Sequence, residues 1–231
     1  MKQYSHIFFD LDKTLWDFEA NSRAVMEDLY MRYALKKRGV PGVTEFFAVY
    51  STINDRLWEQ YRKGAIRKQA LKVKRFELAL RHFSIFDVAL ANLFGREYLE
   101  LLPEKTVLMP GTHALLSYLK PKYPLHIITN GFEEVQEKKM RNTLILDYFT
   151  AIITSEAAGA RKPNAAIFRY AFEKTGAMPA NSLMIGDDLE VDVIGAKESG
   201  MDQIYFNPGR LVHTVPVTWE VAGLLAVKEI L

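Results

Sequence analysis

The chain has 231 residues, 49% of them hydrophobic and 25% charged, which is typical of a globular protein long enough to bury a sizeable core. The absence of cysteine excludes disulfides and thiolate metal sites, and a net charge of +2 is too small to indicate a nucleic-acid or membrane partner. Charges such as Lys120, Lys122 and Lys138 interrupt the longer apolar stretches, so no membrane span is expected. The first predicted strand follows Met1 too closely to leave room for an export signal, and we therefore expect a cytoplasmic protein.

The first half of the chain combines one strand with a long helical region. Residues 4–10 form an apolar run and are predicted to be a strand. Val25, Leu29 and Tyr33 then recur at helical spacing, and similar patterns follow to about residue 105. The predicted helices are 17–37, 46–61, 68–83 and 86–102. No strand is expected among them.

The second half changes to an alternating rhythm. Short apolar runs at 125–129, 150–154, 182–186 and 203–206 are separated by polar helical segments. This alternation is typical of βαβ units and predicts an α/β protein with a doubly wound parallel sheet. The helical region becomes an insert after the first strand. Residues 1–16 and 106–231 are then the sheet domain, and residues 17–105 are the inserted helical domain.

Polar residues that could take part in catalysis or ligand binding lie at the ends of the predicted strands. Asp10 and Asp12 end the first strand, and Thr129 ends the second. Lys162 follows the third strand, and Asp187 follows the fourth. Ligands of open α/β sheets bind outside the carboxyl ends of the strands, so we expect these side chains to converge. Taken singly, each could instead be an ordinary turn or helix-cap residue.

The ordered set of motifs resembles the phosphatase branch of the haloacid dehalogenase (HAD) superfamily. Its four motifs are D-x-D-x-T at Asp10–Thr14, a strand-end Thr129, Lys162, and G-D-x-x-x-x-D at Gly186–Asp192. Within the superfamily the chain most resembles the pyrimidine 5′-nucleotidases. The segments that carry this second resemblance are Phe9–Asp12, Trp16–Phe18, Leu57–Trp58, Tyr61, Gly64–Ile66, Ile128–Phe132 and Lys162–Asn164. The resemblance implies an HAD-like Rossmannoid core with an inserted helical cap domain.

The same resemblance implies a hydrolase with roles for each motif. Asp10 would be the nucleophile that forms an aspartyl-phosphate, and Asp12 would be the general acid and base. Mg²⁺ would be held by Asp10, the backbone carbonyl of Asp12, and Asp187, since hard oxygen ligands suit this ion. The implied phosphate-binding residues are Thr129, Asn130 and Lys162. The residues expected to support these groups are Thr14, Asp188 and Asp192.

The resemblance implies a small phosphomonoester substrate, a pyrimidine nucleoside 5′-monophosphate. Phe18, Trp58, Tyr61 and Arg75 are the candidate substrate-pocket residues, and packing inside the cap is the alternative role for each. Lys13 is expected to face solvent or the mouth of the pocket. Neither a nucleic-acid polymer nor a membrane is an expected partner, and the sequence leaves the oligomeric state open.

Three other functions compete with the nucleotidase hypothesis. A sugar phosphatase or a phosphosugar mutase would use the same motifs. A haloacid dehalogenase keeps the nucleophilic aspartate but lacks the second one, so Asp12 argues against it. A phospho-receiver domain places its phosphorylated aspartate on the third strand and has no large helical insert, which disagrees with the pattern at Asp10.

Overall fold

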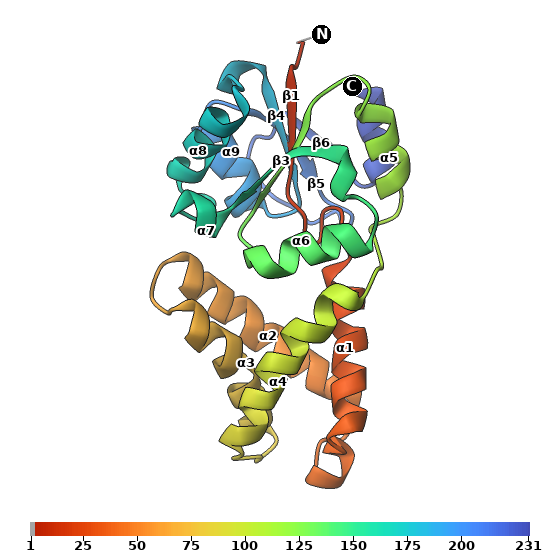
Figure 1. Ribbon diagram of the computed structural model, residues 1–231, viewed down its shortest axis with the longest axis vertical. Coiled ribbons are helices and arrows are strands. Elements are labelled where there is room, and N and C mark those ends of the chain that lie inside the picture. The colour runs from red at the N-terminus through yellow and green to blue at the C-terminus, as the bar shows by residue number, and fades with distance from the viewer. Residues whose placement is uncertain (1–2) are drawn as a thin grey trace. The chain divides into compact units, whose positions relative to one another are not determined.

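The computed structural model describes residues 3–231, and the chain divides into two compact units (Figure 1). The sheet unit comprises Met1–Phe18 and Thr106–Leu231, and the helical unit comprises Glu19–Lys105. Each of the two units has its own buried apolar residues. Among the described residues, no helix combines the length and the apolar character needed to cross a membrane.

The sheet unit is built on six parallel strands in the order β3-β2-β1-β4-β5-β6. The strands are β1 (His6–Phe9), β2 (Leu125–Thr129), β3 (Phe149–Thr154), β4 (Ser182–Gly186), β5 (Asp202–Phe206) and β6 (Trp219–Val221). The predicted doubly wound parallel sheet is confirmed. Every residue of β2 and β4 is buried, as expected for strands that are covered on both faces. Strand β6 was not predicted, because three residues are too few to show a pattern.

Alternate residues of β1 supply cores on both faces of the sheet. Phe8 packs in a cluster with Ile128, Met184 and, from helix α8 (Ala165–Thr175), Phe168. Helices α8 and α9 lie on one side of the sheet and α5 on the other (Figure 1). The helices of this unit are α5 (Thr112–Leu119), α6 (Glu133–Asn142), α7 (Ser155–Ala158), α8 (Ala165–Thr175) and α9 (Gly195–Glu198), with a π-helical turn at Leu189–Ile194.

The register of β1 sets the position of the site. Phe9 pairs with Ile127 of β2 and with Ile185 of β4, so these three strands end at nearly the same level. The chain passes from β1 outward through β2 to β3, and then crosses to β4 on the opposite side of β1. This reversal of strand order is the topological switch point at which ligands of doubly wound sheets bind.

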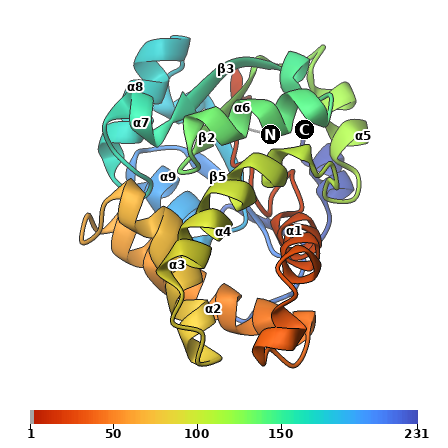
Figure 2. The ribbon, with the colours of Figure 1, turned by 60° about the horizontal axis from the view of Figure 1, so that its bottom comes forward.

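The helical unit contains α1 (Phe18–Arg32) from Glu19 onward, α2 (Val43–Arg62), α3 (Lys68–His82) and α4 (Val88–Leu101). Helix α3 packs against both α2 and α4 (Figures 1 and 2). Residues 19–105 are all described and include no strand. The prediction for α1 was too long at its end. Ala34 adopts a left-handed conformation, with φ 48°, and a short 3₁₀ turn at Leu35–Arg38 follows.

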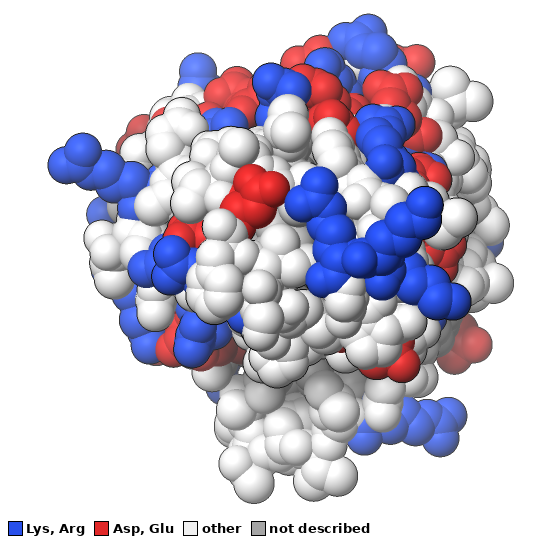
Figure 3. All heavy atoms as spheres, turned by 90° about the horizontal axis from the view of Figure 1, so that it is seen from below, with Lys and Arg blue, Asp and Glu red and all other residues white. Residues whose placement is uncertain are grey.

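Two surface features lie apart from the motifs. On the face drawn in Figure 3, Lys and Arg side chains are interspersed with Asp, Glu and uncharged residues, unlike the continuous basic stripe of many nucleic-acid-binding proteins.

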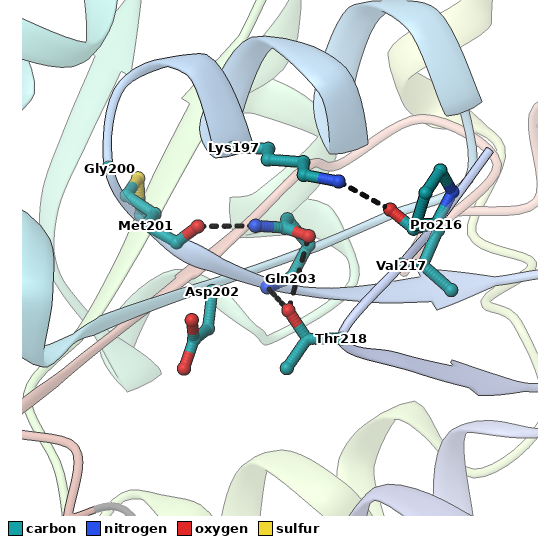
Figure 4. A pocket seen from close by; sticks show the side chains of 8 residues that line it. All are labelled: Lys197, Gly200, Met201, Asp202, Gln203, Pro216, Val217 and Thr218. Atoms are coloured by element: carbon teal, nitrogen blue, oxygen red, sulfur yellow. Dashed lines mark hydrogen bonds between the residues drawn. The ribbon is translucent and has the colours of Figure 1, made fainter.

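A hollow of about 350 Å³ lies at the amino end of β5 (Figure 4). There Gln203 and Thr218 bond to each other, and Lys197 donates to the carbonyl of Pro216 at 2.9 Å. Its walls are thus largely occupied with their own hydrogen bonds.

Candidate active site

A buried lysine stands at the centre of the carboxyl edge of the sheet. The ammonium group of Lys162, whose side chain is 1% exposed, lies 2.5 Å from Asp10 Oδ1 and 2.7 Å from Asp192 Oδ1. It also donates to the carbonyl of Ile128 in β2 at 2.6 Å. Burial alone would lower the pKa of Lys162, but Asp10 and Asp192 together raise it above its usual value. The lysine therefore stays charged and links the motif after β1 to the motif after β4.

Three carboxylates share this edge. Oxygens of Asp10, Asp187 and Asp192 all lie within 4.8 Å of one another. Burial raises the pKa of Asp10 well above its usual range, opposed by Lys162 and reinforced by the other two carboxylates. Burial and Asp192 raise the pKa of Asp187 to about 7. Like charges at this spacing repel unless a cation is present.

The donor set fits a divalent cation. All three side chains offer hard carboxylate oxygens, the ligands that Mg²⁺ prefers. The sequence predicted ligands from Asp10, Asp187 and the backbone carbonyl of Asp12. The structure brings Asp10 and Asp187 together as expected from their strand ends. Asp192 joins them, although Lys162 already occupies one of its oxygens.

Residues after β1 and β4 support this edge with hydrogen bonds. Thr14 donates its hydroxyl to Asp187 Oδ1 at 3.0 Å. Asp188 caps the π-helical turn, accepting from the backbone N–H groups of Glu190 and Val191 at 3.1 and 3.0 Å. Its own N–H donates to Asp192 Oδ2 at 3.1 Å.

Asp12 faces a different set of partners from Asp10. Lys139 of α6 lies 2.5 Å from Asp12 Oδ1, and Gln136 of α6 donates its amide to Asp12 Oδ2 at 2.8 Å. Neither Gln136 nor Lys139 was predicted from the sequence as a site residue. Their segment is rich in Glu and Lys and resembles a solvated helix. The available signal was their spacing of three residues on the helix that directly follows Thr129.

The residues after β2 bond mainly to the protein itself. The Thr129 hydroxyl accepts from the Gly131 N–H at 3.0 Å and from the Gln136 amide at 2.8 Å. The Asn130 side chain accepts from the Lys162 N–H at 2.8 Å and donates to the Lys162 carbonyl at 3.0 Å. Asn130 thus fixes the loop that carries the central lysine, a role that the sequence did not reveal.

The candidate pocket residues lie in both units. Phe18 belongs to the sheet unit, where its ring centroid lies 5.8 Å from the Lys139 ammonium. The rings of Trp58 and Tyr61 meet edge to face at 5.6 Å in the helical unit. Arg75 is buried and donates to Asn54 Oδ1 at 3.1 Å. Its guanidinium also stacks within 5.0 Å of Phe76 and 4.8 Å of Tyr98 in that unit.

Lys13 occupies an unusual backbone position beside the carboxylates. Its φ is 65°, in the left-handed region that few residues other than glycine adopt. Its side chain is exposed, and its charge lowers the pKa of Asp187 against the stronger effect of burial. Among the described residues, no hydrogen bond joins the Lys13 side chain to a motif residue.

Comparisons with known proteins identify the family of the chain. A family model described as haloacid dehalogenase-like hydrolase matches residues 4–200. The pyrimidine 5′-nucleotidase YjjG of Escherichia coli is 30% identical over 99% of this chain and 98% of its own length. The pyrimidine 5′-nucleotidase PynA of Streptococcus pneumoniae is 31% identical over 94% of this chain and 91% of its own.

A solved structure is similar over its whole length. The crystal structure of the HAD-hydrolase YfnB of Bacillus subtilis, bound to magnesium, has a TM-score of 0.89 and 28% identity and covers 99% of both chains. The predicted resemblance to HAD phosphatases, and among them to pyrimidine 5′-nucleotidases, is confirmed. The chain is an enzyme of the haloacid dehalogenase-like hydrolase family.

Proposed function

We propose that the protein is a Mg²⁺-dependent phosphomonoester hydrolase that acts through an aspartyl-phosphate on Asp10, with pyrimidine nucleoside 5′-monophosphates as its substrates. The observation that carries the proposal is the buried Lys162 shared by Asp10 and Asp192, next to Asp187, at the switch point of the sheet. This arrangement offers an anionic nucleophile, a fixed positive charge for the phosphoryl group and oxygen ligands for a metal.

The proposed reaction has two steps. In the first, a carboxylate oxygen of Asp10 attacks phosphorus, the bond from phosphorus to the ester oxygen breaks, and Asp12 gives its proton to the departing oxygen. In the second, Asp12 takes a proton from water as that water attacks the phosphorus of the aspartyl-phosphate. Inorganic phosphate leaves and Asp10 is restored. Lys162 offsets the charge on the phosphoryl oxygens in both steps.

Metal binding would use oxygens of this unit. The carboxylates of Asp10 and Asp187 and the backbone carbonyl of Asp12 are the proposed protein ligands. When bound, Mg²⁺ offsets the repulsion between the anionic nucleophile and the anionic phosphate. YfnB, the relative with a similar fold, was crystallised with magnesium, which supports the proposal.

The proposal for the substrate rests on the relatives. YjjG and PynA are pyrimidine 5′-nucleotidases and match this chain over nearly its full length. The phosphate-binding motifs contact only the phosphate, so discrimination among esters falls to other residues. Phe18, Trp58, Tyr61 and Arg75 are the proposed candidates, and residues 17–105 are the proposed cap domain.

A substrate panel tests the proposal. Purified protein with Mg²⁺ should hydrolyse UMP, dUMP and dTMP faster than purine nucleotides and hexose phosphates, measured by release of inorganic phosphate. Faster hydrolysis of small sugar phosphates would refute the nucleotidase assignment but leave the phosphatase chemistry intact. Failure to hydrolyse any phosphomonoester would refute both.

A further inference from the structure

Helix α6 presents two buried polar side chains to the same carboxylate. Gln136 and Lys139 are three residues apart and therefore lie on one face of the helix. The Gln136 amide donates to one oxygen of Asp12 at 2.8 Å, and the Lys139 ammonium lies 2.5 Å from the other. With a separate donor on each oxygen, the carboxyl plane of Asp12 has a defined orientation.

The burial of Lys139 requires an explanation. Its side chain is 3% exposed, and a buried ammonium group is costly unless charges or dipoles compensate it. Asp12 supplies the charge, and the Trp16 ring, whose centroid lies 4.2 Å from the ammonium, supplies a favourable aromatic face. By contrast, the neighbouring Lys138 on the same helix is exposed. A lysine placed only for solubility would resemble Lys138.

Gln136 connects two motifs. Besides its bond to Asp12, its amide donates to the Thr129 hydroxyl at 2.8 Å. Gly131 makes room for it, because a Cβ at that position would overlap the Gln136 side chain far inside van der Waals contact. The side-chain oxygen of Gln136 is buried and has no hydrogen-bond partner among the described residues. The motifs after β1 and β2 are thus joined through one buried amide.

We infer that Gln136 and Lys139 are positioning residues that aim Asp12 for both of its proton transfers, an inference that rests on the proposed function. In the first step the proton of Asp12 passes to the ester oxygen, and Asp12 becomes a carboxylate. The Lys139 ammonium and the Gln136 amide then stabilise that carboxylate in the orientation from which it takes a proton from water. Neither residue gains or loses a proton in the net reaction.

This role predicts a dependence on the leaving group. The alkoxide of a nucleotide needs a proton as it departs, whereas p-nitrophenolate departs readily without one. Misorientation of the Asp12 carboxyl group should therefore lower kcat/KM for UMP and leave kcat/KM for p-nitrophenyl phosphate unchanged. The second step is common to both substrates, so kcat for p-nitrophenyl phosphate should fall while the first turnover stays fast.

The experiment compares Lys139→Met, Gln136→Met and Lys139→Arg with Lys138→Met, a matched change on the exposed neighbour. Both kinetic constants are measured for UMP and for p-nitrophenyl phosphate with Mg²⁺, and the first turnover is followed by stopped flow. Asp12→Asn provides the reference pattern, since general acid–base catalysis contributes roughly 10²- to 10⁴-fold. Thermal melting of each variant shows whether it folds.

For Lys139→Met we expect kcat/KM for UMP to fall on the order of 10- to 100-fold, a part of that contribution. For p-nitrophenyl phosphate, kcat/KM should be nearly unchanged, while kcat falls and a burst of p-nitrophenol precedes the slower steady state. Gln136→Met should show the same pattern more weakly, Lys139→Arg should restore part of the loss, and Lys138→Met should match the wild type. Equal losses for both substrates, or no loss, would overturn the inference.

Two further outcomes are also decisive. If Lys139→Met does not fold, Gln136→Met and Lys139→Arg are compared in its place. The criterion is again whether kcat/KM falls for UMP and not for p-nitrophenyl phosphate. If the wild type hydrolyses neither ester while folded and loaded with Mg²⁺, the proposed function fails and this inference falls with it. If the wild type hydrolyses both esters and the variants have the same kinetic constants, the positioning role is refuted and the proposed function stands.

Discussion

A buried histidine, His126, paired with the half-buried His6 in the sheet, should make folding stability sensitive to mild acid. His6 Nδ1 and His126 Nε2 lie 3.0 Å apart, and the two rings stack at 5.3 Å. Burial, together with the neighbouring His6, lowers the pKa of His126 from 6.5 to about 4. Burial also lowers the pKa of His6. Both imidazoles are therefore neutral in the folded protein at neutral pH.

The sign of the effect follows from proton binding. Between pH 6.5 and about 4 the unfolded chain binds a proton at His126 that the folded chain does not. With respect to this residue, the free energy of unfolding therefore has its full value above pH 6.5. It decreases as the pH falls from 6.5 to about 4, because protonation then favours the unfolded chain. At about 1.4 kcal/mol per pH unit, the loss is about 3 kcal/mol for this one group.

The assay is urea denaturation followed by circular dichroism at several pH values between 7 and 4, with EDTA present throughout. His126→Phe removes the titrating group and fills the space beside Phe8, whose ring centroid lies 4.7 Å away. We expect the wild type to lose about 3 kcal/mol more than His126→Phe over this range. His82→Phe, a matched change at an exposed histidine, should leave the pH dependence unaltered. Parallel curves for wild type and His126→Phe would refute the reasoning.

Four other predictions concern the site. Asp10→Asn should abolish turnover of every phosphomonoester while circular dichroism stays unchanged, because an amide cannot attack phosphorus; substantial hydrolysis by the pure variant would contradict the assigned role. Chelation should abolish activity, and Asp187→Ala should weaken Mg²⁺ binding measured by calorimetry; full activity after exhaustive chelation would exclude the metal. Trp58→Ala should lower kcat/KM for nucleotides roughly 5- to 150-fold and spare p-nitrophenyl phosphate, since stacking on a base is worth about 1–3 kcal/mol. Gly131→Ala should displace Gln136 and slow UMP hydrolysis, whereas an unchanged kcat/KM would show that the close approach is unimportant.

The sheet was predictable because its central strands are buried on both faces. A strand such as β2, with all five residues buried, must be apolar throughout, and that run is visible in the sequence. The strand ends then locate Asp10 and Asp187 without further information. The same reasoning misses β6, which lies at the edge of the sheet and is too short to form a run.

The contacts made by helices and loops were harder to predict from the sequence. The spacing of Gln136 and Lys139 places them on one face of α6, but the sequence does not show that this face, and not that of exposed Lys138, is the buried one. Asn130 was predicted to bind phosphate, and its bonds to the backbone of Lys162 depend on a loop that returns from 32 residues further along the chain. Such partners are set by tertiary packing rather than by local pattern.

The two aspartates of the first motif show how environment separates identical side chains. Asp10 and Asp12 are two residues apart, yet each faces its own lysine: Lys162 for Asp10 and Lys139 for Asp12. The Asp10 side chain is 11% exposed and lies among other carboxylates, a setting suited to the metal-assisted nucleophile that we propose. The Asp12 side chain is 27% exposed, which suits the proton exchange with substrate and water that we propose for it. Different surroundings can give two carboxylates different tasks, and in the proposed mechanism the division begins with which lysine reaches which oxygen.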